Sequence, residues 1–317
     1  MNRTVLGRTG LEVSVAGLGA GGGSRLGRKT GKSFGESVRL VHAAVDLGVN
    51  FIDTAPIYGT EPIIGAALAA IPRDRVVVST KAWENWRSRD ADVRTIASLD
   101  RSLRDLKTDY IDVFHLHGVT PGDYADAVKV LPALLREREK GKIRWLGITE
   151  YPPGDFRHEM LRQAFEDDWF DVVMLAFSML NQNARAHSFP GTRKYRIGTL
   201  IMFAVRNIFS FPGRLRAALG KLAEKGEVPD WLAAEKDPLG FLIHPEGAGD
   251  IIEAAYRFCR HEPGVDVTLF GTGDLDHLER NIESLTRPPL PDADRRRIEE
   301  LFGALEGVGL EHGMAKT

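Results

Sequence analysis

The chain has 317 residues, of which 43% are hydrophobic and 27% charged, and its formal net charge is -2. This balance lacks the excess of cations that nucleic acid or an anionic membrane surface attracts, so neither is expected as a partner. Because no apolar run is long enough to cross a bilayer and the single cysteine, Cys259, has no internal disulfide partner, a cytoplasmic protein with small soluble ligands is predicted, of unspecified oligomeric state.

The predicted elements begin with a small hairpin, in which Arg8–Gly10 forms the turn between Val5–Leu6 and Leu11–Val13. Short β-branched runs then alternate with longer amphipathic runs, a pattern typical of strand–helix units around a parallel sheet. Ser33 and Glu36 form a capping box before the first such helix. The eight predicted strands are Val13–Leu18, Phe51–Asp53, Val76–Thr80, Ile111–Leu116, Ile143–Ile148, Val172–Ala176, Leu200–Phe203 and Val267–Phe270.

The last third of the chain is less regular. Turns at Val228-Pro229-Asp230 and His244-Pro245-Glu246-Gly247 interrupt residues 207–249, which are predicted to form a long, partly helical loop, and Asp292–Leu305 is predicted to be a final helix. The expected fold is therefore α/β: one (β/α)8 TIM barrel domain over residues 1–317, with an N-terminal β-hairpin and an additional C-terminal helix.

Four side chains follow the predicted strand ends, where barrel geometry brings residues distant in sequence together. Tyr58 is expected to donate a proton to a carbonyl oxygen that accepts a hydride, and to act as the base in oxidation. Lys81 would lower the pKa of the phenol, Asp53 would hold Lys81 protonated and oriented, and His117 would bind the substrate oxygen or assist proton movement. This set predicts hydride transfer to a carbonyl. It does not require a metal, and no metal site is predicted.

These motifs resemble the catalytic tetrad of the aldo-keto reductase family, with Asp53, Tyr58, Lys81 and His117 at the matching positions. The likeness extends to the Leu6–Leu11 segment (LGRTGL) and covers most of residues 4–302. It implies an NAD(P)-dependent oxidoreductase. Within the family, the sequence most resembles the galactose-dehydrogenase-like branch, through residues 111–115 and 147–149.

The resemblance also implies positions that hold the nicotinamide ring. The hydroxyl and amide after strand five correspond here to Thr149 and Glu150, and the strand-six residue corresponds to Met174. An ionised Glu150 accepts from the carboxamide NH₂ but cannot donate to its carbonyl. Either Met202 or Phe203 is expected to cover the ring, with barrel packing as the alternative for the methionines.

Two glycine-containing turns are expected to approach the cofactor: Gly19, Ala20 and Gly21 after the first strand, and Gly271, Thr272 and Gly273 before the helix-like Leu275–Ser284. The resemblance places Asn281 at the adenine. His277 and Gly271 stand where basic residues usually meet the 2′-phosphate, and Arg280 lies nearby. The family's preference therefore favours NADP(H), and the missing positive charge leaves NAD(H) as the alternative.

Trp83, with Trp86 and Phe177, predicts an aromatic wall for the substrate, and His115 is expected either to pack inside the barrel or to contact the substrate together with Tyr58 and His117. A small aldehyde or ketone is the preferred substrate and a sugar the alternative. A cofactor-binding regulatory barrel with little turnover, or a non-redox barrel enzyme, remains open.

Overall fold

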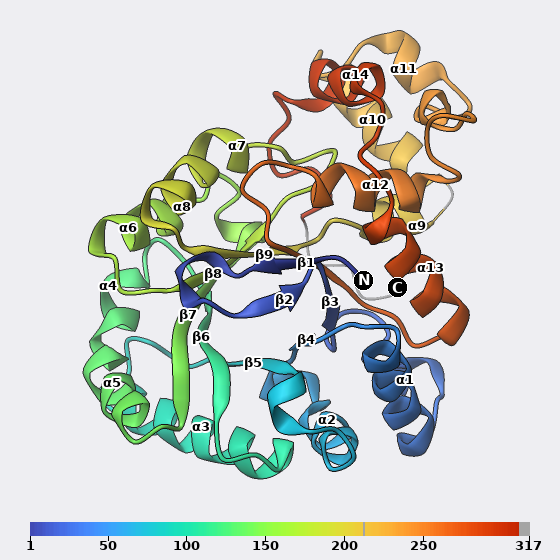
Figure 1. Ribbon diagram of the computed structural model, residues 1–317. Helices are drawn as coiled ribbons and strands as arrows, with labels where there is room; N and C mark the ends of the chain where they lie inside the picture. The colour runs from blue at the N-terminus through green and yellow to red at the C-terminus, as the bar shows by residue number, and fades with distance from the viewer. Residues whose placement is uncertain (212, 311–317) are drawn as a thin grey trace.

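The computed structural model describes residues 1–211 and 213–310. In that part of the chain, eight parallel strands close into a barrel in the order β10-β3-β4-β5-β6-β7-β8-β9 (Figure 1). The barrel strands are β3 (Ala16–Gly19), β4 (Phe51–Asp53), β5 (Val77–Ala82), β6 (Ile111–Val119), β7 (Ile143–Glu150), β8 (Val172–Ala176), β9 (Gly198–Met202) and β10 (Val267–Phe270). The predicted (β/α)8 TIM barrel is confirmed.

Two hydrophobic clusters explain why the barrel closes. Inward residues of the strands, Phe51, Val113, Trp145 and Leu200 among them, fill the interior. The alternate residues of the strands pack with the surrounding helices in a larger cluster, because successive side chains of a β-strand point to opposite faces.

The helices are α1 (Phe34–Asp46), α2 (Glu61–Leu68), α3 (Ala91–Leu106), α4 (Tyr124–Ala127), α5 (Leu131–Glu139), α6 (Glu159–Asp167), α7 (Ala184–His187), α8 (Phe189–Tyr195), α9 (Asn207–Ser210), α10 (Arg214–Glu224), α11 (Asp230–Ala234), α12 (Ile251–Arg260), α13 (Leu275–Thr286) and α14 (Asp292–Phe302). None of the described helices has both the length and the apolar character needed to cross a membrane.

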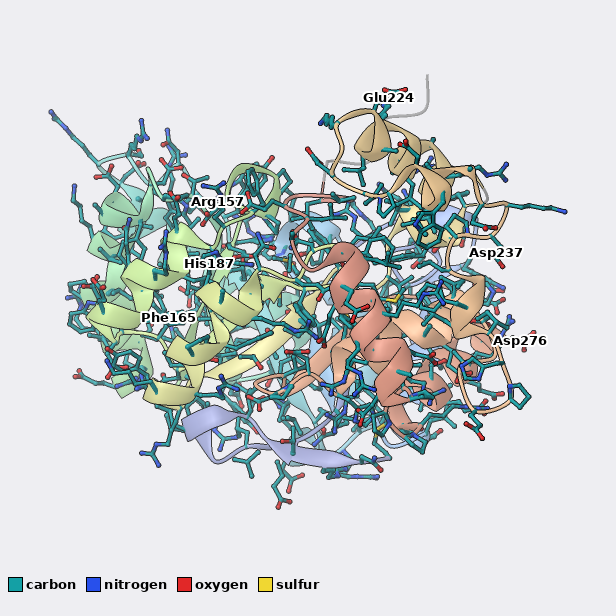
Figure 2. All side chains as sticks on the ribbon, turned by 90° about the horizontal axis from the view of Figure 1, so that it is seen from above. Arg157, Phe165, His187, Glu224, Asp237 and Asp276 are labelled. Carbon is teal, nitrogen blue, oxygen red and sulfur yellow. The ribbon has the colours of Figure 1, made fainter. Side chains whose placement is uncertain are left out.

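The N-terminal hairpin is present, but the first barrel strand was predicted to begin too early. The run Val13–Leu18 is broken at Val15 into β2 (Glu12–Ser14), which pairs antiparallel with β1 (Arg3–Val5), and the first barrel strand β3. The predicted turn contains a short 3-10 helix, Gly7–Thr9. The hairpin lies across one end of the barrel, and the segment with α10 and its Glu224 projects from the opposite end (Figure 2).

The predicted capping box is also present. Ser33 accepts a hydrogen bond from the backbone N–H of Glu36, and the backbone N–H of Ser33 donates to the Glu36 carboxylate at 2.7 Å. The predicted loop 207–249 contains α9, α10 and α11, so the excursion is partly helical as predicted, and the final helix α14 begins at the predicted residue.

Candidate active site

Lys81 and Asp53 form a buried ion pair at the C-terminal end of the barrel. Lys81 Nζ donates to the two Asp53 carboxylate oxygens at 2.5 and 2.6 Å and to the Thr54 carbonyl at 2.8 Å. Ser79, two residues before Lys81 on the same face of β5, donates to Asp53 at 2.9 Å. Burial raises the pKa of Asp53, and the charge of Lys81 opposes that shift. The two side chains therefore fix each other, as the sequence predicts.

Tyr58 lies above this pair. Its ring centroid is 5.4 Å from Lys81 Nζ, and the His117 ring meets it edge to face with centroids 5.9 Å apart. Among the described residues, the Tyr58 hydroxyl forms no hydrogen bond, either with Lys81 or with His117. The phenol is thus held through its ring, and its O–H group is available to a ligand.

The electrostatics of Tyr58 differ from the prediction. Burial raises the pKa of the phenol above its ordinary value, while the Lys81 charge acts in the opposite direction. Lys81 therefore limits the increase but does not produce a net acid shift, because burial has the larger, opposite effect and the Asp53 charge adds to it. A phenol with a raised pKa stays protonated at neutral pH.

His117 is a neutral base in this setting. Burial, and then the nearby Lys81 charge, lower its pKa to about 3. Its Nδ1 is buried and has no hydrogen-bond partner among the described residues. A neutral imidazole of this kind can donate a hydrogen bond to a ligand oxygen and adds no positive charge to the site.

His115 lies one layer deeper on the same face of β6 and is fully buried. Gly147 on β7 makes room for it, since a Cβ at Gly147 would come within 2.2 Å of His115 Nδ1. Burial and Lys81 lower the pKa of His115 well below its ordinary value. Its position agrees with the packing alternative, whereas the predicted substrate contact has no support in this geometry.

The first barrel loop touches the candidate acid directly. A Cβ built on Gly21 would lie 2.8 Å from Tyr58 Cε2, so the backbone there packs flat against the ring. The preceding Ala20 donates its N–H to the Asp53 carbonyl at 2.8 Å. At its far end the same loop reaches the turn after β10, where a Cβ on Gly273 would meet the Gly27 Cα at 2.5 Å. The glycines predicted near the cofactor therefore border one continuous surface.

The expected nicotinamide contacts divide into two groups. Thr149 accepts a hydrogen bond from the Gly118 N–H at 2.7 Å, next to His117, and pairs in register with Met174, which packs in the interior cluster. Met202 ends β9 and contacts the interior cluster, while Phe203 follows in the left-handed region with φ of 69° and stacks on Arg206 at 4.1 Å. Both are partly exposed, so either ring-covering prediction remains a prediction.

Glu150 is engaged elsewhere. One carboxylate oxygen accepts from the Ala176 N–H at 2.8 Å and the other contacts His158 Nδ1 at 2.6 Å, with both side chains fully buried. The Glu150 carboxylate raises the pKa of His158 against the opposing effect of burial, and burial raises the pKa of Glu150. A nicotinamide carboxamide that hydrogen-bonds to Glu150 would have to share the carboxylate oxygens that already bond to Ala176 and His158.

This pair gives a pH-dependent prediction for stability. The folded pair retains a proton between its two members, whereas unfolded His158 loses its proton above its ordinary pKa near 6.5. Folding then takes up a proton, so the free energy of unfolding should decrease as the pH rises above about 6.5, by at most about 1.4 kcal/mol per pH unit. Urea unfolding of the wild type and of Glu150→Gln/His158→Gln, measured from pH 6 to 9, checks this. Equal slopes for the two proteins would contradict it.

The turn after β10 is preorganised by its own residues. Thr272 Oγ1 accepts from the Asp274 N–H at 3.0 Å, and Asp274 caps α13 by accepting from the His277 N–H. His277 and Arg280 are exposed on α13, and Asn281 is half-buried. The phosphate and adenine roles predicted for these residues stay predictions.

The predicted aromatic wall is wrong in part. Phe177 is fully buried and packs against Phe189 and Phe258, with ring centroids 5.3 and 5.7 Å away, because the chain turns outward after β8. Trp86 is also buried, and Trp83 is 59% exposed at the end of β5. Of the three, Trp83 alone is open to a substrate.

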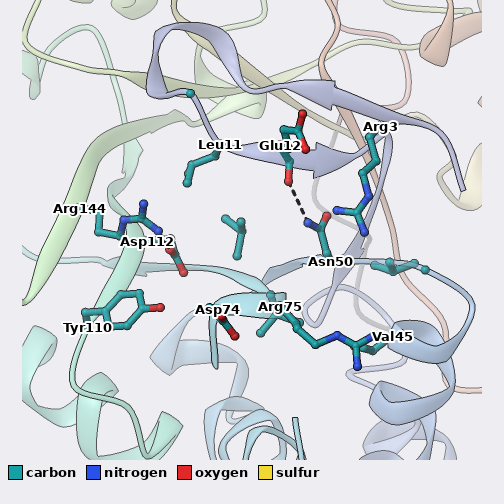
Figure 3. A pocket seen from close by; sticks show the side chains of 15 residues that line it. Arg3, Leu11, Glu12, Val45, Asn50, Asp74, Arg75, Tyr110, Asp112 and Arg144 are labelled. Atoms are coloured by element: carbon teal, nitrogen blue, oxygen red, sulfur yellow. Dashed lines mark hydrogen bonds and ion pairs between the residues drawn. The ribbon is translucent and has the colours of Figure 1, made fainter. Parts of the chain in front are cut away.

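The polar cavity in Figure 3 belongs to the other end of the barrel. It has a volume of about 540 Å³ and is lined by Glu12 of the hairpin and by the starts of β5, β6 and β7, including Asp112 and Arg144. Asn50 donates there to the Glu12 carbonyl at 2.9 Å. This cavity contains none of the tetrad side chains.

Arg25 and Glu61 are site residues that sequence reasoning missed. The charge of Arg25, in the loop after β3, opposes the increase in the pKa of Tyr58 that burial causes. Glu61 accepts from Thr80 at 2.7 Å and so joins the segment after Tyr58 to the strand of Lys81. A basic residue in the first glycine-rich loop, and an acid three positions after Tyr58, were the available signals.

A lysine-bound acid, a phenol and a neutral imidazole lie together at the mouth of the closed barrel, and these groups can hold and move a proton. Residues 18–302 match the model of the aldo/keto reductase family, and the chain belongs to that family. Family membership and its relatives support carbonyl reduction with a nicotinamide cofactor.

Two relatives align over nearly their whole length. L-galactose dehydrogenase from Arabidopsis thaliana is 27% identical over 96% of this chain and 94% of its own, and aldo-keto reductase YhdN from Bacillus subtilis is 26% identical over 95% and 94%. Among solved structures, the holo form of aldo-keto reductase AKR11C1 from Bacillus halodurans matches with a TM-score of 0.71 and 20% identity, over 98% of this chain and 100% of that one. The last match supports the fold.

Proposed function

We propose that this protein reduces small aldehydes or ketones with NAD(P)H, and that Tyr58 is the general acid. The observation that carries the proposal is the stack of Asp53, Lys81 and Tyr58, in which the ammonium is saturated by acceptors and the phenolic O–H bonds to none of the described residues. A sugar-like substrate is the alternative, supported by the likeness to L-galactose dehydrogenase.

The residues at the barrel mouth fit a nicotinamide cofactor. The unpartnered His117 Nδ1 and the close glycine backbones leave polar groups and backbone surface for it. Bound there, the cofactor supplies the hydride. Residues proposed to hold it are Gly19, Ala20, Gly21, Asp53, Thr149, Glu150, Met174, Met202, Phe203, Gly271, Thr272, Gly273, His277, Arg280 and Asn281.

Residues of the chain would then supply the proton for the reduction. Negative charge develops on the carbonyl oxygen, Tyr58 donates its proton there, and neutral His117 orients the oxygen through a hydrogen bond. Lys81 stabilises the phenolate that remains, and Asp53 keeps the ammonium in place. Since burial raises the pKa of Tyr58, the protonated form suits reduction at neutral pH, and oxidation requires a more alkaline medium.

Parallel fluorescence titrations with NADPH and NADH, followed by turnover assays on a panel of aldehydes, ketones and sugars, test the function. We expect quenching of tryptophan fluorescence by at least one cofactor, tighter binding of NADPH than of NADH, and turnover of aldehydes. Binding without turnover on the whole panel would support a regulatory barrel, and binding of neither cofactor would refute the proposal.

A further inference from the structure

Arg25 is a half-buried cation at the barrel mouth. It lies in the loop after β3, and among the described residues no carboxylate is within ion-pair distance of its guanidinium. Removing a guanidinium from water without a partner is unfavourable. Several other half-buried arginines are paired, for example Arg73 with Asp112 at 2.6 Å and Arg185 with Glu262. An arginine without an ion-pair partner among the described residues at this position is therefore expected to bind an anionic ligand.

The backbone fixes Arg25 in place. Arg25 and Leu26 both adopt the left-handed conformation, with φ of 48° and 56°, which side chains with a Cβ rarely take. The Leu26 side chain is buried, its carbonyl accepts from Ser37 Oγ at 2.7 Å, and the Arg25 carbonyl accepts from the Arg28 N–H. A residue held in this way presents its side chain with little loss of entropy on binding.

The loop places Arg25 on the side of the reacting groups. Gly21 packs against the Tyr58 ring, and the Arg25 guanidinium is close enough for its charge to act on the phenol. The turn after β10 has a cation of its own, since the charge of Lys32 acts on Asp274, the residue that caps α13. This division assigns Arg25 to the substrate and the far end of the loop to the cofactor.

The rim beside Tyr58 is apolar. Ile57 precedes Tyr58 and is 49% exposed, and the indole of Trp83 follows Lys81 by two residues. A ligand that satisfies both features has an apolar or aromatic body, a carbonyl that reaches Tyr58 and an anionic group that reaches Arg25.

We propose that Arg25 forms an anion subsite and that the preferred substrates are carboxylate-bearing aldehydes or ketones with an apolar body. This inference rests on the proposed function and names its substrate class. A carboxylate bound by two parallel N–H donors of the guanidinium orients the molecule as well as attracting it.

The test compares 4-formylbenzoate with its neutral methyl ester, methyl 4-formylbenzoate, in the wild type and in Arg25→Gln. We expect the kcat/KM of the wild type for the carboxylate to exceed that for the ester. Arg25→Gln should lower the value for the carboxylate about 10- to 100-fold and that for the ester by less than about threefold. Arg25→Lys should recover part of the loss, and high salt should reduce the preference of the wild type.

Lys29→Gln is the matched control, because Lys29 is an exposed cation of the same loop without a side-chain partner among the described residues. It should keep the preference for the carboxylate. Equal losses on both aldehydes, no loss on either, or a weakening of NAD(P)H binding that accounts for the whole effect would overturn the assignment of Arg25 to the substrate.

Calorimetry with benzoate and neutral benzamide separates this proposal from the proposed function, because neither ligand is reduced. Benzoate should bind the wild type at least about tenfold more tightly than it binds Arg25→Gln, and benzamide should bind both alike. If the wild type turns over neither aldehyde but shows this difference, the proposed function fails and the anion subsite stands. If the wild type reduces both aldehydes but benzoate binds the wild type and Arg25→Gln equally well, the anion subsite is refuted and the proposed function is not.

Discussion

Tyr58→Phe should lower kcat by about 10²- to 10⁴-fold with the dissociation constant of NAD(P)H nearly unchanged. The substitution removes one oxygen and keeps the ring that packs against Gly21, contacts Lys81 and meets His117 edge to face. Because the Tyr58 hydroxyl bonds to no described residue, folding should be little affected. Steady-state kinetics and fluorescence titration of the same preparation measure the two quantities.

Tyr195→Phe is the matched control. Its hydroxyl accepts from the adjacent Lys194 at 3.1 Å on α8, outside the barrel, so its loss should leave kcat at the wild-type value. Ordinary turnover by Tyr58→Phe would show that another group supplies the proton.

Lys81→Met should abolish measurable turnover and also destabilise the fold. Lys81 is fully buried, and its removal leaves the Asp53 carboxylate without its counter-ion. Breaking a buried ion pair by removing one partner costs about 3–5 kcal/mol, and protonation of Asp53 reduces that penalty at low pH. Urea unfolding at pH 5 and pH 8 measures the loss, which we expect to be larger at pH 8.

The double variant Asp53→Asn/Lys81→Met separates stability from chemistry. It removes both charges, so it should recover much of the free energy of unfolding while turnover stays absent. If the double variant is no more stable than Lys81→Met, the instability has another source than the stranded carboxylate.

The strand–helix alternation was sufficient to predict the barrel and the convergence of Asp53, Tyr58, Lys81 and His117 at its mouth, because strand ends in a closed barrel converge wherever they lie in the sequence. Contacts that depend on turns were not predictable in this way. Glu150 pairs with His158 only because the turn at Pro152–Gly154 brings the chain back, and Phe177 faces helices because the chain leaves the barrel after Ala176.

The strength of individual electrostatic effects was also beyond the sequence. The sign of the Lys81 contribution to the pKa of Tyr58 was predicted correctly, yet the net shift depends on how deeply the phenol is buried. Arg25 escaped notice because its proposed role rests on the lack of an ion-pair partner among the described residues, a property of the folded chain and not of a motif.

The pairing of β3 with β10 joins Ala16–Leu18 to Thr268–Phe270. During synthesis, one edge of the first barrel strand therefore stays unpaired until β10 has left the ribosome. Such distant contacts slow folding and leave strand edges open to aggregation. Truncation before Val267 would remove the strand that seals the barrel, so premature termination should yield insoluble chains instead of a smaller functional protein.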